Sequence, residues 1–121
     1  MAMMTNSQQK GKYGENVVLG YLEAKGYKIL AQNYKKAGGE IDIIALDGDY
    51  VVFVEVKYRR GRSHGTGFDD VSYSQHKRII KTAKAYLYER DKWDAPCRFD
   101  IIEVFGREQL EVEHIENAFW E

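Results

Sequence analysis

The sequence of 121 residues contains one cysteine, Cys97, and three scattered histidines, His64, His76 and His114. A single cysteine excludes an internal disulfide framework and a cysteine-rich zinc site. The histidines form no His-x(3)-His pair, so we expect them to be polar residues of the surface or core. The chain also lacks an apolar run near the roughly 18 residues that a membrane helix needs. Its first residues lack the charged and apolar regions of a secretory signal. We therefore expect a soluble, cytoplasmic protein with no membrane partner.

The overall composition is ordinary, with 44% hydrophobic residues, and this excludes intrinsic disorder as the main state. A chain of this length is large enough to bury a core as a single domain, which we expect to span 1–121. It contains no repeat, low-complexity segment or internal linker. We expect residues 1–6 to be flexible.

Hydrophobic periodicity predicts seven elements in the order αβββαββ. The helices are expected at 8–25 and 72–89, and the strands at 27–34, 39–46, 50–58, 98–105 and 110–115. A glycine-containing loop at 59–70 is expected to be mobile. This order predicts an α/β (α+β) fold with a mixed sheet of about five strands flanked by helices. The second helix is placed to be a crossover that makes the third and fourth strands parallel.

The net charge of −1 conceals a strongly basic segment. From Lys57 to Lys84, eight Lys or Arg residues face only two acids, Asp69 and Asp70. Such a local field attracts phosphate, although a solvated helix face beside a charged loop would have the same composition.

Carboxylates interrupt two otherwise apolar strands. Because side chains alternate along a strand, Glu40 and Asp42 share one face, and Glu55 and Lys57 share one face. A two-residue turn at Gly48-Asp49 places Asp42 opposite Glu55, on the same side of the sheet. A turn at Asp47-Gly48 would instead pair Glu40 with Glu55, and only an odd-length loop would separate the two sets.

Two facing carboxylates repel each other unless a cation lies between them. Oxygen ligands without nearby His or Cys favour Mg²⁺ or Mn²⁺. We therefore expect an open metal site made by Asp42, Glu55 and the backbone carbonyl of Val56, with Glu40 as a further candidate ligand. Lys57 would point into the same space. The alternative is a half-exposed hairpin in which Glu40 and Lys57 simply pair across the strands.

The spacing of Asp42, twelve residues, and then Glu55-Val56-Lys57 resembles the D-x(n)-E-x-K signature of the PD-(D/E)xK, restriction-endonuclease-like nucleases. A wider set of short motifs resembles the YraN-like family of small, largely uncharacterised predicted endonucleases. These motifs are Gly11, Gly14-Glu15, Gly26-Tyr27, Asn33-Tyr34, Gly39-Glu40-Ile41-Asp42, Phe53-Val54-Glu55-Val56-Lys57, Arg59 and Arg98-Phe99-Asp100. The superfamily often has Pro before its first acid, where this chain has Ile41.

The resemblance implies a restriction-endonuclease-like fold and metal-dependent cleavage of DNA. It implies that Glu15, Asp42 and Glu55 are metal-site acids, that Lys57 is the catalytic lysine and that Gln75 supports the site. The chain is also similar to archaeal Holliday-junction resolvases, which place an acid on the first helix. A homodimer like that of the resolvases is a further expectation that the sequence leaves open.

Two groups of cations are expected to hold the DNA backbone without reading its sequence. They are Arg59, Arg60 and Arg62 of the loop, and Lys77, Lys81 and Lys84 at helical spacing. Cleavage selective for branched, nicked or junction DNA is therefore expected. A non-catalytic nucleic-acid-binding module and a protein-interaction domain are the alternatives.

Two further expectations concern residues outside this site. Asp100 is expected near Lys57, as an ion-pair partner rather than a metal ligand. Phe119 and Trp120 are expected to pack on the core rather than to form a dimer contact.

Overall fold

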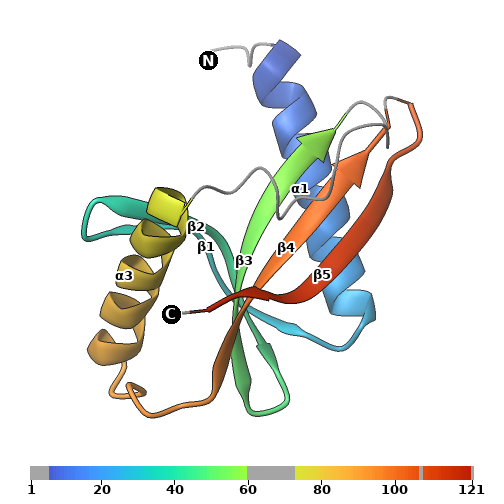
Figure 1. Cartoon of the computed structure of the whole chain (residues 1–121). Helices are drawn as coiled ribbons and strands as arrows, with labels where there is room; N and C mark the ends of the chain where they lie inside the picture. Colours follow the sequence, from blue (N-terminus) through green and yellow to red (C-terminus); the bar gives the residue numbers. More distant parts are fainter. Residues whose placement is uncertain (1–5, 60–72, 107, 121) are drawn as a thin grey trace, which may run out of the picture.

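A computed structural model describes residues 6–59, 73–106 and 108–120. Along the chain the elements are α1 (Asn6–Ala24), β1 (Lys28–Lys36), β2 (Gly39–Asp47), β3 (Tyr50–Arg59), α3 (Tyr73–Glu89), β4 (Cys97–Phe105) and β5 (Glu111–Phe119). The predicted order and fold class are confirmed (Figure 1). None of the helices in this part of the chain is long and apolar enough to cross a lipid bilayer.

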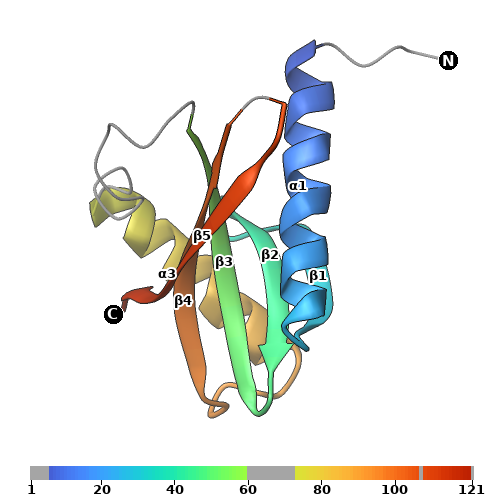
Figure 2. The same cartoon turned by 90° about the vertical axis from the view of Figure 1, so that its right-hand side faces the viewer.

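The five strands form one mixed sheet in sequence order, β1-β2-β3-β4-β5. Neighbouring strands are antiparallel except for β3 and β4, which are parallel, as predicted for strands connected through a helix. The sheet lies between the two helices, with α1 on one face and α3 on the other (Figure 2). The sheet therefore has an α1 side and an α3 side, and each has its own core.

Each core is built from alternate residues of the central strands. On the α3 side, Phe53, Phe99 and Ile101 pack with the buried face of α3. On the α1 side, Val52, Val54 and Ile102 pack with Val18 and Leu22 of α1. Because both faces of β3 and β4 are covered, these strands are apolar almost throughout, which is typical of parallel neighbours.

The last strand is longer than its pattern predicts. β5 continues beyond Ile115 to Phe119, and Phe119 is buried against Phe99 with ring centroids 5.1 Å apart, whereas Trp120 is 72% exposed. The predicted packing of Phe119 on the core is confirmed, and the predicted packing of Trp120 is wrong. A register shift opposite Phe99 and a positive φ at Asn117 interrupt the alternation, so the simple strand pattern ends too early.

The β2–β3 hairpin has the predicted two-residue turn. Asp47 pairs with Tyr50, and the ladder continues in that register to Ile43 opposite Val54. Gly48 adopts a φ of 59°, the left-handed conformation that such a tight turn requires. The pairing stops at Ile43, one residue before the two predicted site acids.

Beyond that point β2 twists away from β3 and remains paired with β1 alone. Ile43 packs in the α1-side core, but Ile41 and Ile44 both pack in the α3-side core. In a regular strand Ile41 would lie on the same face as Ile43. The strand is therefore twisted sharply at Asp42, and the β1–β2 hairpin reaches over to α3.

The tip of that hairpin is held against α3 by a close backbone approach. The Thr82 hydroxyl donates to the Lys36 carbonyl at 2.8 Å. A Cβ atom on Gly39 would lie 2.4 Å from Thr82 Oγ1 and 3.1 Å from the carbonyl oxygen of Arg78. Only a glycine at position 39 allows this contact.

Gly39→Ala is expected to lower the free energy of unfolding by about 1–3 kcal/mol, because Thr82 must give up its hydrogen bond or the helix must shift. Gly20→Ala is the control, since nothing lies within 4 Å of a Cβ there and helix propensity improves. Urea denaturation measures both, and equal stability of the two variants would contradict the close approach at Gly39.

Candidate active site

The candidate site lies at the edge of β3 where β2 is no longer paired with it. The Val56 N–H donates to Asp42 Oδ2 at 2.8 Å, so the carboxylate takes the place of the missing strand. The N–H and C=O of one strand residue point to the same edge, so the Val56 carbonyl faces this opening as well. Asp42 and the Val56 carbonyl therefore lie beside each other, as the sequence predicts.

Glu55 and Lys57 lie on the α3 side of β3, in line with Phe53. Lys57 Nζ is 3.4 Å from Glu55 Oε1, and the two side chains are 21% and 20% exposed. The prediction that they share a face is confirmed. The pKa of Glu55 is raised to about 7, mainly by burial and then by the negative charge of Asp42, against the opposing effect of Lys57.

The pKa of Asp42 is also raised. Burial is the main cause; the Val56 N–H opposes it, and the charges of Glu40 and Glu15 add to it. We call these four residues, Glu15, Glu40, Asp42 and Glu55, the acidic cluster. The structure thus brings together the acids that the sequence proposed, from α1, β2 and β3.

Glu15 reaches the acidic cluster from α1, and a neighbour on β1 orients it. Asn33 Nδ2 donates to Glu15 Oε1 at 3.1 Å. Asn33 has a φ of 50°, a conformation that asparagine tolerates better than most residues. The site therefore depends on the docking of α1 against β1, which no strand pattern reveals.

Tyr58 is a neighbour of the cluster that sequence reasoning missed. Burial raises the pKa of Tyr58, and the charges of Asp42 and Glu15 add to the effect. A Cβ atom on Gly14 would lie 2.3 Å from its ring, so Gly14 provides the space for this side chain. The sequence feature that could have pointed to this side chain was Gly14, which directly precedes Glu15.

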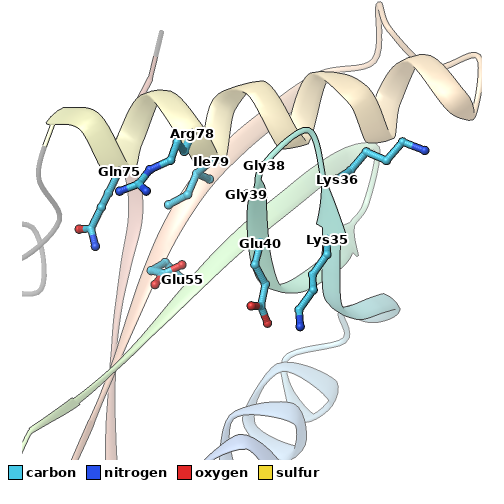
Figure 3. A pocket seen from close by; sticks show the side chains of 9 residues that line it. All are labelled: Lys35, Lys36, Gly38, Gly39, Glu40, Glu55, Gln75, Arg78 and Ile79. Carbon is cyan, nitrogen blue, oxygen red and sulfur yellow. The ribbon is translucent and has the colours of Figure 1, made fainter.

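A pocket of about 660 Å³ opens beside Glu55, between the β1–β2 hairpin tip and the start of α3 (Figure 3). Its lining residues are Lys35, Lys36, Gly38, Gly39, Glu40, Glu55, Gln75, Arg78 and Ile79. Gln75 is therefore at the site, as expected, whereas Asp42 and Lys57 are not among the lining residues. Lys35 and Arg78 were missed, although Lys35 is the register partner of Glu40 and Arg78 follows Gln75 by one helical turn.

The donor set suits a hard cation in an open site. Within the described ranges, no three His, Cys, Asp or Glu side chains converge as a ready-made metal cage. Mg²⁺ typically takes only one or two protein carboxylates and completes its shell with water and phosphate oxygens. Asp42, Glu55 and the Val56 carbonyl fit that requirement, and Glu40 lies within electrostatic reach.

The structure places the predicted DNA-binding cations in different surroundings. Arg59 is the last residue of β3, and its Nε donates to Glu103 Oε2 at 3.3 Å, with the two side chains 15% and 1% exposed. Arg59 thus neutralises a buried carboxylate, which corrects its placement in the loop. Arg60 and Arg62, with the rest of the predicted loop, lie outside the described residues.

The lysine stripe of α3 lies on its outer side. Lys77, Lys81 and Lys84 are exposed, opposite the apolar face that contacts the sheet. Lys77 Nζ lies 4.7 Å above the ring of Tyr73. The predicted exposure of the stripe is confirmed.

Asp100 lies on the α1 side, not near Lys57. It is fully buried and accepts hydrogen bonds from Arg98 Nε at 3.1 Å and the Asn117 N–H at 2.9 Å, with His114 Nε2 2.7 Å away. Burial by itself would raise the pKa of Asp100, but these hydrogen bonds outweigh it and lower the pKa. The predicted ion-pair role is confirmed, and the predicted position is wrong because residues 55 and 100 have opposite parity in the β3–β4 register.

The raised pKa of Glu55 predicts a pH-dependent cost to stability. The carboxyl titrates near 4.5 in the unfolded chain and near 7 in the folded protein, so the unfolded chain releases its proton first. Wild-type protein should therefore lose stability as pH rises through this window, by on the order of 2 kcal/mol. The Glu55→Gln variant should not show this loss of stability as pH rises through the same window.

Urea unfolding at pH 5 and pH 8 measures the effect, with Glu23→Gln on the exposed side of α1 as the control. Relative to wild type, Glu55→Gln should be more stable at pH 8 than at pH 5. If the difference between the two proteins were the same at both pH values, Glu55 would not carry the shifted titration.

Comparisons with known proteins identify the family of this chain. Residues 14–104 match the model of an uncharacterised protein family, UPF0102. A UPF0102 protein of Clostridioides difficile (strain 630) is 44% identical over 114 residues, covering 94% of this chain and 99% of the relative. Another, of Symbiobacterium thermophilum, is 43% identical over 117 residues, covering 93% and 98%. A third, of Stutzerimonas stutzeri, is 36% identical over 118 residues, covering 96% and 98%. The chain therefore belongs to the UPF0102 family, the YraN-like group that its motifs resemble.

Proposed function

We propose that this protein is a metal-dependent DNA endonuclease that hydrolyses phosphodiester bonds in branched, nicked or junction DNA. The observation that carries the proposal is the convergence of Asp42, Glu55 and Lys57 at the open edge of β3. Strongly shifted pKa values in acids with a specific charge partner are typical of functional sites. A protein acting on DNA in this way would work in the cytoplasm.

The acids would hold Mg²⁺ or Mn²⁺ together with the Val56 carbonyl. Such an ion supplies a water of lowered pKa and a positive charge for the phosphate oxygens. Glu55, with a pKa near 7, is ready to lose its proton when a cation arrives. Glu15 and Glu40 add negative charge that favours cation binding.

Lys57 would act on the reacting phosphate. Its ammonium lies beside Glu55 and is only 21% exposed, so its charge is weakly screened. There it would orient the attacking water and stabilise the charge that develops on the phosphate. Gln75 lines the pocket next to Glu55 and would support the same water or phosphate through its amide.

Binding of the DNA backbone would come from the exposed stripe of Lys77, Lys81 and Lys84, together with the basic segment that follows β3. Contacts of this kind position a duplex but carry no sequence information. Selectivity for DNA structure is therefore the better expectation. A homodimer would present two such sites to a branched substrate.

The second candidate function is a non-catalytic nucleic-acid-binding module. The ion pair between Lys57 and Glu55 favours it, because an internal cation already compensates one of the two central acids. Such a protein would bind DNA with the same lysine stripe and would cleave none.

Cleavage should separate the two candidates. Wild-type protein is incubated with linear, nicked, flapped and four-way DNA in Mg²⁺ or Mn²⁺, beside Lys57→Ala, Glu55→Gln and the control Lys92→Ala. We expect cleavage of the interrupted or branched substrates and at least a hundredfold loss in the two site variants, since each removes transition-state stabilisation. Lys92→Ala should retain full activity.

DNA binding is measured in parallel by fluorescence anisotropy. Glu55→Gln should bind DNA as well as wild type or better, because a negative charge near the phosphate is gone. Binding by wild type with no cleavage of any substrate would favour the non-catalytic module.

Divalent metal should stabilise the wild type through the acidic cluster. At a Mg²⁺ or Mn²⁺ concentration one hundred times the dissociation constant, a single site adds about 2.7 kcal/mol. Thermal unfolding at pH 8 should show this increase in Tm for wild type, and not for Asp42→Asn or Glu55→Gln. An equal metal-induced shift in all three proteins would place the metal elsewhere.

A further inference from the structure

The size and the surroundings of the pocket beside Glu55 indicate which kind of ligand it can bind. Its volume of about 660 Å³ lies within the range of about 300–1,000 Å³ that is typical of small-ligand sites. A DNA duplex is far wider than such a pocket, whereas one or two unpaired nucleotides are of the right scale. The pocket walls come from the β1–β2 hairpin tip and the start of α3 (Figure 3).

The pocket is also lined by cationic side chains, on both of its walls. Lys35 stands beside Glu40, its cross-strand partner, and Arg78 lies on the opposite wall. The side chain of Lys36, the next residue, points away from Glu40 and Glu55 (Figure 3). Its Nζ forms an ion pair with Glu89 Oε1 at 2.6 Å. Both lysines line the pocket, but the ammonium of Lys36 is already paired with Glu89, whereas Lys35 lies on the side of Glu40.

We propose that this pocket is a binding subsite for an unpaired DNA strand, in which Lys35 and Arg78 bind its backbone phosphates. The inference rests on the proposed function, since the strand held here is the one that would pass Asp42 and Glu55. A guanidinium binds phosphate oxygens in a bidentate manner, and the lysine supplies a mobile point charge. Without these cations, Glu40 and Glu55 would repel the strand.

The remaining lining residues suit the rest of a nucleotide. The Gln75 amide has donors and an acceptor for a sugar or base edge. Ile79 offers an apolar surface, and Gly38 and Gly39 leave the hairpin backbone accessible. A single strand with unpaired bases can use these groups, whereas a paired duplex exposes mainly its phosphates.

The pocket is held open by the fold rather than formed by the ligand. The bond from Thr82 to the Lys36 carbonyl and the close approach at Gly39 tie its two walls together. Preorganised walls lower the cost of ordering side chains on binding. The substrate class that follows is DNA with a single-stranded flap or end, in preference to a fully paired four-way junction.

The test compares two double variants of equal charge, Lys35→Gln with Arg78→Gln and, as the control, Lys28→Gln with Lys92→Gln, at two exposed lysines that do not line the pocket. Fluorescence anisotropy in Ca²⁺ measures their affinity for a labelled single-stranded oligonucleotide and for a blunt duplex of the same sequence. The first pair should weaken single-strand binding at least tenfold and lower its salt slope by about 1.4, the value for two phosphate contacts. Its affinity for the duplex, and both affinities of the second pair, should stay within threefold of wild type.

Equal weakening by both double variants would overturn the subsite, since any two cations would then serve. Equal weakening for single strand and duplex by the first pair would overturn it as well. Thermal unfolding confirms that each variant is folded before binding is compared.

The outcome is distinguishable from failure of the proposed function. If wild type cleaves nothing but the binding pattern holds, the nuclease proposal fails and the subsite stands. If Glu55-dependent cleavage is found without the binding pattern, the subsite alone fails.

Discussion

The hydrogen bond from the Val56 N–H to Asp42 is the contact on which the site depends. Where β2 leaves β3, the backbone of β3 loses a strand partner in a half-buried place, and an unpaired N–H there is costly. Asp42 satisfies that N–H with its side chain. In doing so it is held at the sheet edge, next to Glu55, where its own charge makes the neighbouring carboxyl harder to ionise.

Asp100 on one face of the sheet and the pair of Asp42 and Glu55 on the other have opposite pKa shifts. On the α1 side, Asp100 receives hydrogen bonds from Arg98 and Asn117 and contacts His114, and its pKa is lowered. On the α3 side, Asp42 and Glu55 repel each other, and their pKa values are raised. A carboxylate with several hydrogen-bond donors stabilises the fold, whereas two neighbouring carboxylates that repel each other carry a free-energy cost that a cation would relieve.

The acids and the cations of the site are brought into place by different features of the fold. The tight turn sets the β2–β3 register as far as Ile43, and where the strands separate the Val56 N–H holds Asp42 beside Glu55. The docking of the β1–β2 hairpin on α3 brings Lys35 and Arg78 to the same place. A site able to hold both a cation and a phosphate backbone therefore requires the hairpin contact at Gly39, which itself contributes no chemistry.

Local sequence patterns were enough to predict the element order, the mixed sheet and the two-residue turn between β2 and β3, because alternation and turn chemistry depend on neighbouring residues. They did not reveal that Arg59 is paired with Glu103 or that Asp100 lies on the far face. Those facts were decided only by tertiary structure. Helix docking and the point at which a strand leaves its neighbour arise from packing between segments distant in the chain, and no local pattern encodes them.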